Sequence, residues 1–219
     1  AGVYPVNFKV DWGDGTTSLI DSTNYVANRL HTYFSPGQYT ITATGSVAGF
    51  NFWNMYDLGS SNLWDACKLI TIDQWGDLIM TRGASGGFAS QSGQCFRQCG
   101  NLTKVTGTNI DLSLWDVTNI SNMRGMFQNC DKFNGVMWKN LRSGGVDLRN
   151  MFFGAGNFNN GGSNVGIQQW NTGNVTRMDS MFQSAVNFNS DISAWDTSSV
   201  TNMEYMFAGL VTGNHTFNQ

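Results

Sequence analysis

The chain has 219 residues, of which 41% are hydrophobic and 12% are charged, and its formal net charge is −3. This apolar content is enough for one or two packed domains. The sequence has neither an apolar run long enough to span a membrane nor a basic cluster of the kind that binds nucleic-acid backbones. It begins AGVYPV, without an initiator methionine or a signal peptide, and stops within a pattern, so we expect a processed or partial chain.

The first predicted elements are two β-strands near the N-terminus. VNFKVDW (6–12) and YTITAT (39–44) alternate apolar and polar residues, which is typical of half-buried strands. Gly and Pro residues between them indicate tight turns. The motifs VDWGDGT and HTYFSPGQYTITATG resemble the polycystic-kidney-disease (PKD) type of immunoglobulin-like module. This resemblance implies a small β unit, common in extracellular proteins as a spacer or a contact to protein or glycan. We place it at residues 1–50, as a cap on the repeats that follow.

Residues 51–219 contain a repeat of about 25 residues. Each clear copy has Met or Leu and then Met-Phe three residues later; three residues after the Phe stands Cys130, Ala155 or Ala185 in the first three copies. The Phe residues of the four clearest copies are separated by 25, 30 and 25 residues, and the longer step contains the polar insert NNGGSNVG (159–166). Such a unit cannot bury its apolar side alone, so we expect neighbouring repeats to stack and share a core. The predicted core ladder consists of Met126, Phe127, Met151, Phe152, Met181, Phe182, Met206, Phe207, Cys67, Cys99 and Cys130.

The repeats predict a stack of about six coils, with a strand at residues 188–195 and a short helix or helical turn at 200–207. FNSDISAWDTSSVTNM and VTNMEYMFAGL resemble the BspA-like, leucine-rich-repeat kind of bacterial surface-protein repeat. The resemblance implies a right-handed solenoid exposed outside cells, with adhesive or host-recognition roles; related repeats also occur in phage virion proteins. The predicted fold class is therefore mainly β with short helices: a leucine-rich-repeat-like right-handed solenoid with an N-terminal immunoglobulin/PKD-like β cap.

No set of residues predicts catalysis or metal binding. Copper-type thioether sites need converging side chains, whereas these methionines are spread along an axis. Asp11 and Asp14 flank a Gly-rich turn, but two acids fall short of the roughly six to eight oxygens that calcium takes, which favours turn capping. Neither His31 nor His215 has a His or Cys at zinc-ligand spacing, and no nucleophile is evident beside them. We expect no enzyme activity, no cofactor and no metal.

The cysteines leave two interpretations open. Cys67, Cys99 and Cys130 occupy the same position of successive repeats, so neighbours could form a disulfide or face the core as free thiols. Core thiols are the favoured interpretation, and Cys95, which occupies a methionine position, is expected to be buried.

Two further columns of residues are also ambiguous. Asparagines follow the second Phe of each repeat and form either a polar binding stripe or, as we favour, a ladder that satisfies turn backbone groups. These asparagines are Asn134, Asn159, Asn189 and Asn218. Tryptophans could stack on sugars if exposed, or pack at the corners of a coil. These tryptophans, the candidate partner-binding residues, are Trp115, Trp138, Trp170 and Trp195.

The function expected from the sequence is a non-catalytic, surface-exposed recognition, adhesion or structural module. One alternative is a bacteriophage virion component, such as a capsid decoration or tail-fibre protein, and another is a binding appendage of a secreted enzyme. The expected partners are a protein or glycan on a cell or virion surface, with self-assembly of copies or with virion proteins also open. We expect an extracellular, cell-surface or virion location.

Overall fold

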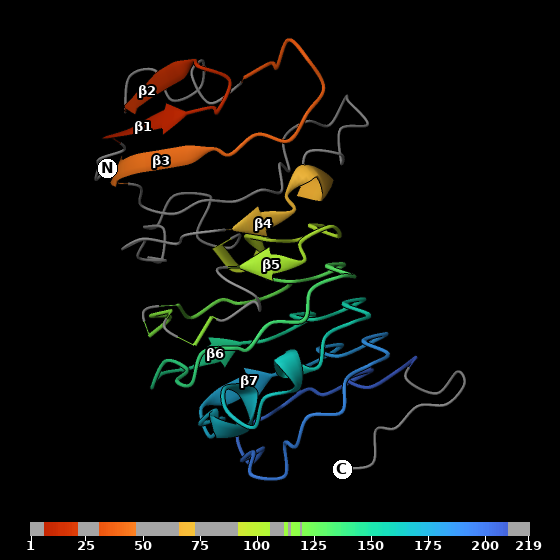
Figure 1. Ribbon diagram of the computed structural model, residues 1–219. Coiled ribbons are helices and arrows are strands. Elements are labelled where there is room, and N and C mark those ends of the chain that lie inside the picture. The colour runs from red at the N-terminus through yellow and green to blue at the C-terminus, as the bar shows by residue number, and fades with distance from the viewer. Residues whose placement is uncertain are drawn as a thin grey trace. The chain divides into compact units, whose positions relative to one another are not determined.

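The computed structural model describes residues 7–21, 31–46, 66–72, 92–105, 112–113, 115–118 and 120–209. The chain divides into two compact units, Ala1–Gly49 and Phe50–Gln219. We call them the N-terminal unit and the repeat region and describe each by itself (Figure 1).

The N-terminal unit contains a three-stranded antiparallel sheet in the order β2-β1-β3. Its strands are β1 (Asn7–Asp11), β2 (Thr17–Asp21) and β3 (Thr42–Ser46). β1 and β3 overlap the two strands predicted from alternation, whereas β2 was not predicted. The sheet buries Val10 of β1 and Ile20 of β2. Gly13, in the turn between these strands, has a φ of 78°, and a Cβ there would lie 2.5 Å from the carbonyl oxygen of Thr40, so only glycine fits.

Where the structure describes it, the repeat region is built mostly of turns and irregular segments, with few regular elements. Its strands have two or three residues and form two separate parallel pairs, β4-β5 and β6-β7, and its helices are single 3₁₀ turns. In chain order the elements are η1 (Ala66–Lys68), β4 (Thr71–Ile72), η2 (Ser92–Gln94), β5 (Lys104–Val105), β6 (Val146–Asp147), η3 (Asn160–Gly162), η4 (Ile167–Gln169) and β7 (Val175–Arg177).

The predicted fold class is therefore wrong. Within the described ranges no continuous sheet runs along the repeats and no α-helix occurs, so the mainly β, leucine-rich-repeat-like solenoid with short helices is not what forms. Residues 188–195, predicted as a strand, contain no strand, and residues 200–207, predicted as a helix, form turns. The short strands β6 and β7 instead lie directly before the first Leu or Met of their repeats, Leu148 and Met178.

Left-handed residues explain why the Met-Phe segments form neither helix nor strand. In each of the four clearest copies, the second and sixth residues after the first Met or Leu have a positive φ, between 53° and 76°. A residue in that conformation interrupts both a helix and an extended strand, and the chain therefore makes consecutive turns. These residues are Gly125 and Asn129, Asn150 and Gly154, Ser180 and Ser184, and Tyr205 and Gly209.

The Met-Phe segments of successive repeats are joined by backbone hydrogen bonds that run from each repeat to the next, whereas the flanking segments also donate in the opposite direction, as from Asp147 N to Ser121 O at 2.9 Å. Alternate amides of one repeat donate to carbonyls of the next repeat, while the amides between them close turns within the repeat, such as Met126 N to Met123 O at 3.2 Å. The bonds from the Phe127 repeat to the Phe152 repeat are Met123 N to Asp147 O (2.9 Å), Gly125 N to Arg149 O (2.8 Å), Phe127 N to Met151 O (2.9 Å) and Asn129 N to Phe153 O (2.7 Å). The same four bonds recur at the next two junctions.

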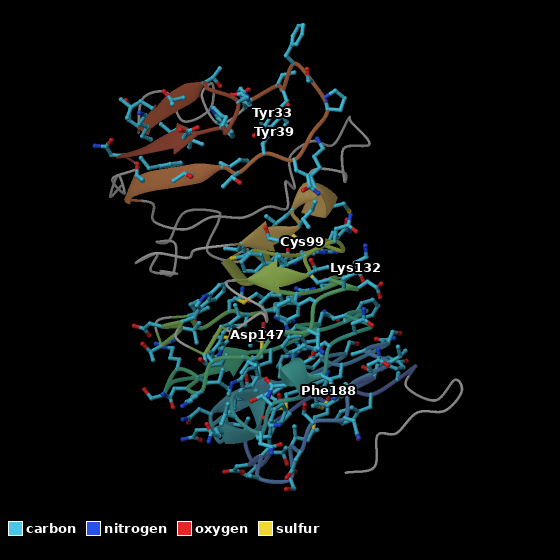
Figure 2. All side chains as sticks on the ribbon, viewed as in Figure 1. Tyr33, Tyr39, Cys99, Lys132, Asp147 and Phe188 are labelled. Carbon is cyan, nitrogen blue, oxygen red and sulfur yellow. The ribbon has the colours of Figure 1, made fainter. Side chains whose placement is uncertain are left out.

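The core of the repeat region consists of columns of stacked aromatic rings. Ring centroids in the first column are 5.8, 5.6 and 5.8 Å apart from Phe127 through Phe152 and Phe182 to Phe207. A second column contains Phe133, Phe158 and Phe188, the last of which is labelled in Figure 2. Each buried Phe contributes about 1.5–3 kcal/mol, so these columns provide a large part of the stability of the stack.

The insert 159–166 is accommodated by one buried asparagine. The side-chain oxygen of Asn160 accepts a hydrogen bond of 3.0 Å from the backbone amide of Met137. Its nitrogen donates to the carbonyls of Ser163 at 3.0 Å and Val165 at 2.6 Å. The insert therefore closes on itself, and the Phe152–Phe182 spacing across it remains 5.6 Å.

Candidate interaction surface

Polar side chains flank the first methionine or leucine of each repeat. Side chains alternate across the extended backbone at β6 and β7, so Leu148 and Met178 enter the core while their neighbours reach the surface. Successive repeats pair in parallel here, with Asp147 opposite Arg177. Bridges continue this pairing to the repeats on either side. We call the resulting surface the ladder face; it consists of Asn122, Arg124, Asp147, Arg149, Arg177, Asp179, Asn202 and Glu204.

Asparagine and aspartate in the first column of the ladder face hold the turn that follows them. Their side-chain oxygens accept the backbone amide two residues later, which is an Asx turn. These bonds are Arg124 N to Asn122 Oδ1 (3.0 Å), Arg149 N to Asp147 Oδ1 (3.1 Å) and Glu204 N to Asn202 Oδ1 (2.8 Å). This surface was not predicted from the sequence, although Asn or Asp directly before Met or Leu is a signal for it.

Two ion pairs occupy the middle of the ladder face. The guanidinium of Arg149 donates from Nε to both carboxylate oxygens of Asp147, at 2.8 and 2.9 Å, and from a terminal nitrogen to Oδ2. In the next repeat the order of charges is reversed, and Arg177 Nε donates to Asp179 Oδ1 at 2.9 Å. The hydrogen bond to Asp147, helped by the charges of Asp147 and Asp179, raises the pKa of Arg149. Partly exposed pairs of this kind contribute about 0–1 kcal/mol, so they order the side chains more than they stabilise the fold.

The two ends of the ladder face carry opposite charges that are not compensated there. Arg124 at one end and Glu204 at the other are exposed, and neither takes part in an ion pair among the described residues. The middle of the face is neutral because each cation lies beside an anion. The surface therefore presents a positive group, a neutral centre and a negative group in a fixed order, held on backbone that is bonded repeat to repeat.

The tryptophans are a stacked column that lies mainly in the core. Ring centroids of Trp115, Trp138, Trp170 and Trp195 are 6.0–6.2 Å apart. Trp138 and Trp170 are 1% and 3% exposed, and Trp170 Nε1 donates to the carbonyl of Trp138 at 2.7 Å. The sugar-stacking interpretation is therefore wrong for these two, because their faces are covered by neighbouring rings. Trp115 and Trp195 remain partly exposed.

The predicted core ladder lies along the interior of the repeat region, except that Cys67 is only half-buried. Its methionine and first-column Phe residues are buried from Met126 to Met206, and Phe207 is partly buried. None of the four cysteines forms a disulfide. Cys130 Sγ donates to the carbonyl of Phe96 at 2.8 Å, and Cys67 Sγ donates to that of Gln98 at 3.3 Å.

Burial also determines the acidity of the cysteine thiols. It raises the pKa of Cys95 and of Cys99 to about 12, and raises the pKa of Cys130 as well. Thiolate is the reactive form of cysteine, so these three side chains are protonated and unreactive at neutral pH.

The asparagines that follow the second Phe of each repeat could form either a structural ladder or a binding stripe. In the structure, the side-chain oxygens of Asn134 and Asn159 accept hydrogen bonds from backbone amides, as a structural ladder requires. Asn134 Oδ1 accepts from Asn159 N at 2.8 Å and from Gly161 N at 2.9 Å. Asn159 Oδ1 in turn accepts from Asn189 N at 2.8 Å. Asn218 lies outside the described residues.

In the N-terminal unit, His31 is engaged by aromatic rings and a carboxylate. Its ring stacks on Trp12 with centroids 4.7 Å apart, and Nε2 lies 2.8 Å from Asp14 Oδ2. Tyr33 contacts His31 edge-on and stacks on Tyr39 at 4.0 Å; Tyr33 and Tyr39 are labelled in Figure 2. The hydroxyl of Thr16 donates to Asp14 at 2.6 Å and is the main cause that lowers the pKa of Asp14 to about 2.

The acids of the N-terminal turn serve as turn caps. Asp11 Oδ1 accepts the amide of Gly13 at 2.9 Å, and Asp14 Oδ1 accepts that of Thr16 at 3.0 Å. His215 lies outside the described residues. Within the described ranges, no three His, Cys, Asp or Glu residues are grouped so as to hold a metal ion, and no helix has the length and apolar character to cross a membrane.

Comparison with protein families gives a match to the C-terminal part of the chain. The family model described as "Mycoplasma protein of unknown function, DUF285" matches residues 94–219, more than half of the chain. No curated protein and no solved structure matches the sequence. The matched segment contains the four clearest repeats, the aromatic columns and the whole ladder face. The chain therefore belongs to the DUF285 family.

Proposed function

We propose that this protein is a non-catalytic recognition module on a cell or virion surface, and that the ladder face contacts its protein or glycan partner. The observation that carries the proposal is the fixed order of charges from Arg124 through the Asp147–Arg149 and Arg177–Asp179 pairs to Glu204. Groups held in place before binding lose little conformational entropy on association, and charge order provides specificity.

Among the described residues, the buried cysteines and His31 are engaged in structural roles, which supports the non-catalytic part of the proposal. The buried cysteines have raised pKa values and face the core. The imidazole of His31 is held between Trp12 and Asp14. Neither arrangement leaves a nucleophile beside a general base, as nucleophilic catalysis requires.

Family membership supports the surface location. DUF285 is associated with BspA-like surface repeats, and the FNSDISAWDTSSVTNM and VTNMEYMFAGL stretches resemble such repeats in sequence. The three-stranded sheet and its VDWGDGT turn fit a PKD-like module of the kind used as an extracellular spacer. Both assignments are part of the proposal.

The test is binding of the full chain to a panel of purified polysaccharides and extracellular-matrix proteins. A charge-exchanged variant, Arg124→Glu with Glu204→Lys, should weaken binding to the recognised member by about tenfold or more. Lys132→Glu is the matched control, because Lys132 is exposed but lies away from Asp147 (Figure 2). Equal binding by the wild type and the charge-exchanged variant would exclude the ladder face. Copurification with phage particles in fixed stoichiometry would place the module on a virion rather than on a cell.

A further inference from the structure

The charges of the ladder face change sign when their order is reversed. The face has two columns whose members are in register, as the pairing of Asp147 with Arg177 and the flanking bridges show. In chain order, the first column is neutral, negative, positive, neutral, and the second is positive, positive, negative, negative. Taken from the other end, each column therefore has the opposite sign at every charged position. The first column is Asn122, Asp147, Arg177 and Asn202, and the second is Arg124, Arg149, Asp179 and Glu204.

This pattern is complementary to a second copy of the same face. A two-fold axis that lies in the plane of the face and runs across the repeats brings two copies together with their repeats in opposite directions. Each column then faces the same column of the other copy, and every charge faces its opposite. The amides of the asparagines also match, because each one both donates and accepts. The facing pairs are Arg124 with Glu204, Arg149 with Asp179, Asp147 with Arg177, and Asn122 with Asn202.

A parallel arrangement of the two copies matches fewer of the charges. A two-fold axis along the stack exchanges the columns, so Arg124 faces Asn122 of the second copy and Glu204 faces Asn202. The ion pairs in the middle of the face still meet opposite charges, but the two exposed end charges do not. Electrostatic complementarity across an interface fixes its register, and it therefore favours the antiparallel arrangement.

The ion pairs in the middle of the face retain hydrogen-bonding groups for a second copy. Among the described residues, the guanidinium of Arg177 donates to Asp179 through Nε only, and the Arg177 side chain is 39% exposed. Its terminal N–H groups remain for a carboxylate of the second copy. Both oxygens of Asp147 accept from Arg149, and each oxygen has a further lone pair. Contact would thus join the pairs into a network, which contributes more than isolated exposed pairs do.

The positive end of the face has a further reason to attract an anion. Burial and, after it, the charge of Arg124 lower the pKa of Arg97, so two cations lie close together here. In the preceding repeat, the position of Arg124 is occupied by Gly93, which has no side chain, and the charge pattern therefore begins at Arg124. A carboxylate of the second copy would lie near both cations and reduce their repulsion.

We propose that the ladder face binds a second copy of this protein in an antiparallel, two-fold symmetric contact. The inference rests on the proposed function, because it takes the ladder face as the contact surface and names its partner. A face of this size is at the small end of protein interfaces, so one contact should be weak, with a Kd of about 10 µM to 1 mM. Many copies on two facing surfaces would strengthen the contact through multivalency.

The first experiment measures self-association of the full chain by sedimentation velocity at concentrations up to about 1 mM. The wild type should dimerise, and raising the salt from about 50 to about 500 mM should weaken dimerisation by about tenfold or more, because salt screens exposed charges. Arg124→Glu places two carboxylates opposite each other and should also weaken it by about tenfold or more. Glu204→Lys should act in the same way through two cations.

Two features of the variants keep this comparison specific. The side chains of Arg124 and Glu204 are exposed and form no ion pair among the described residues, so both variants should retain the fold, which circular dichroism verifies. Lys132→Glu is the matched control, because it changes the net charge as Arg124→Glu does. It should dimerise as the wild type does.

Mixing the two single variants tests the antiparallel arrangement directly. The Arg124→Glu and Glu204→Lys proteins should associate with each other, although each fails to associate with itself, because every altered position then faces the opposite charge. The charge-exchanged variant carries both changes. It should bind itself as strongly as the wild type binds itself, but it should not bind the wild type.

The outcomes separate this inference from the proposed function. A monomeric wild type at about 1 mM and low salt, single variants that dimerise as the wild type does, or a mixture that fails to associate would each overturn the inference. A monomeric wild type whose binding to a panel member is weakened by the charge exchange would overturn the second copy as partner and leave the proposed function intact. The mixing pattern together with panel binding that the charge exchange leaves unchanged would support the second copy and exclude the panel member from this face.

Discussion

The side-chain oxygen of Asn159 lies 2.8 Å from the backbone amide of Asn189, thirty residues further along the chain. The same oxygen accepts the hydroxyl of Ser190 at 3.1 Å, and Ser190 is buried. Asn134 performs the same task for Asn159 one repeat earlier. Each asparagine thus provides the hydrogen-bond acceptor for a backbone amide at the corner of the following repeat, and the same contact recurs from repeat to repeat.

Replacing Asn159 by alanine should lower the free energy of unfolding by about 1–3 kcal/mol, because it leaves an amide of the next repeat without its acceptor. Asn159→Asp keeps an acceptor oxygen and should restore part of the loss. Urea denaturation provides the measurement. Asn157→Ala is the control, because the bond between Asn157 and Asn187 is exposed and should be worth about 0.5 kcal/mol or less. Equal effects at positions 157 and 159 would contradict a structural role of the column.

The same charge should have different effects at the buried Met181 and at the exposed Met203. Met181→Asp places an unpaired carboxylate among buried rings and should cost about 4 kcal/mol or more, enough to unfold the stack. Met203→Asp introduces the same group at a residue with 41% exposure and should cost about 1 kcal/mol or less. Thermal melting of the two variants compares them directly. A Met181→Asp protein with wild-type melting would show that Met181 is not a core residue.

Gly93 approaches the backbone of the next repeat, and this contact should be intolerant of a methyl group. A Cβ at Gly93 would lie 2.5 Å from the amide nitrogen of Arg124, whereas a Cβ at Gly100 would lie 3.6 Å from its nearest neighbour, the carbonyl oxygen of Asn129. Gly93→Ala should therefore destabilise the protein by about 1–3 kcal/mol. Gly100→Ala should change the unfolding free energy by no more than about 1 kcal/mol. Denaturant midpoints of both variants test this difference.

The N-terminal unit should lose stability in acid through Asp14. The folded state holds the pKa of Asp14 at about 2, below its ordinary value of 3.8, chiefly because Thr16 donates to the carboxylate. A depressed pKa means that the folded state favours the ionised form. The contribution of Asp14 is therefore complete above pH 3.8 and is lost as the pH falls toward about 2.

NMR signals of the amide of Thr16 would follow this loss, since that amide donates to Asp14. Asp14→Asn should remove the pH dependence of the local stability in this window. An unchanged acid profile in the Asn variant would show that another group controls the transition. Three other aspartates, Asp116, Asp191 and Asp196, also have lowered pKa values, but they lie in the repeat region. Because Thr16 lies in the N-terminal unit, its amide signal reports the titration of Asp14 and not of these three.

The cysteines should differ in reactivity toward a thiol reagent. Cys95, Cys99 and Cys130 are buried and their pKa values are raised, so they should remain unmodified in the native protein at pH 8. Cys67 is partly exposed and should react first. Mass spectrometry of the modified chain identifies the sites, and unfolding in guanidinium should expose all four. Simultaneous modification of all four in the native protein would contradict the buried positions.

The sequence indicated which residues of a repeat pack together but not the backbone that carries them. Fixed offsets of Met, Phe and Cys identify columns, because residues at the same offset meet when repeats stack. The backbone was misassigned because the decisive left-handed positions are filled by several residue types. Gly125 and Gly154 suggest such a conformation, whereas Ser180 and Tyr205 in equivalent roles give no such signal.

The candidate surface was missed for a related reason. Asn122, Asp147 and Asn202 look like ordinary polar residues until the turn that each one caps is known. The tryptophans show the opposite case: their exposure depends on whether a neighbouring ring covers them. Trp138 and Trp170 have rings on both sides and are buried, whereas Trp115 and Trp195, the first and last rings of the described column, remain half-buried.

The insert at 159–166 has a practical consequence. The hydrogen bonds of Asn160 hold the extra residues in a local loop. The repeat that contains them therefore keeps the ring spacing of its shorter neighbours. Extra residues at this corner therefore do not alter the stacking of the neighbouring repeats. The corresponding corners of other repeats are places where an epitope or an affinity tag could be grafted with little cost to the remainder of the molecule.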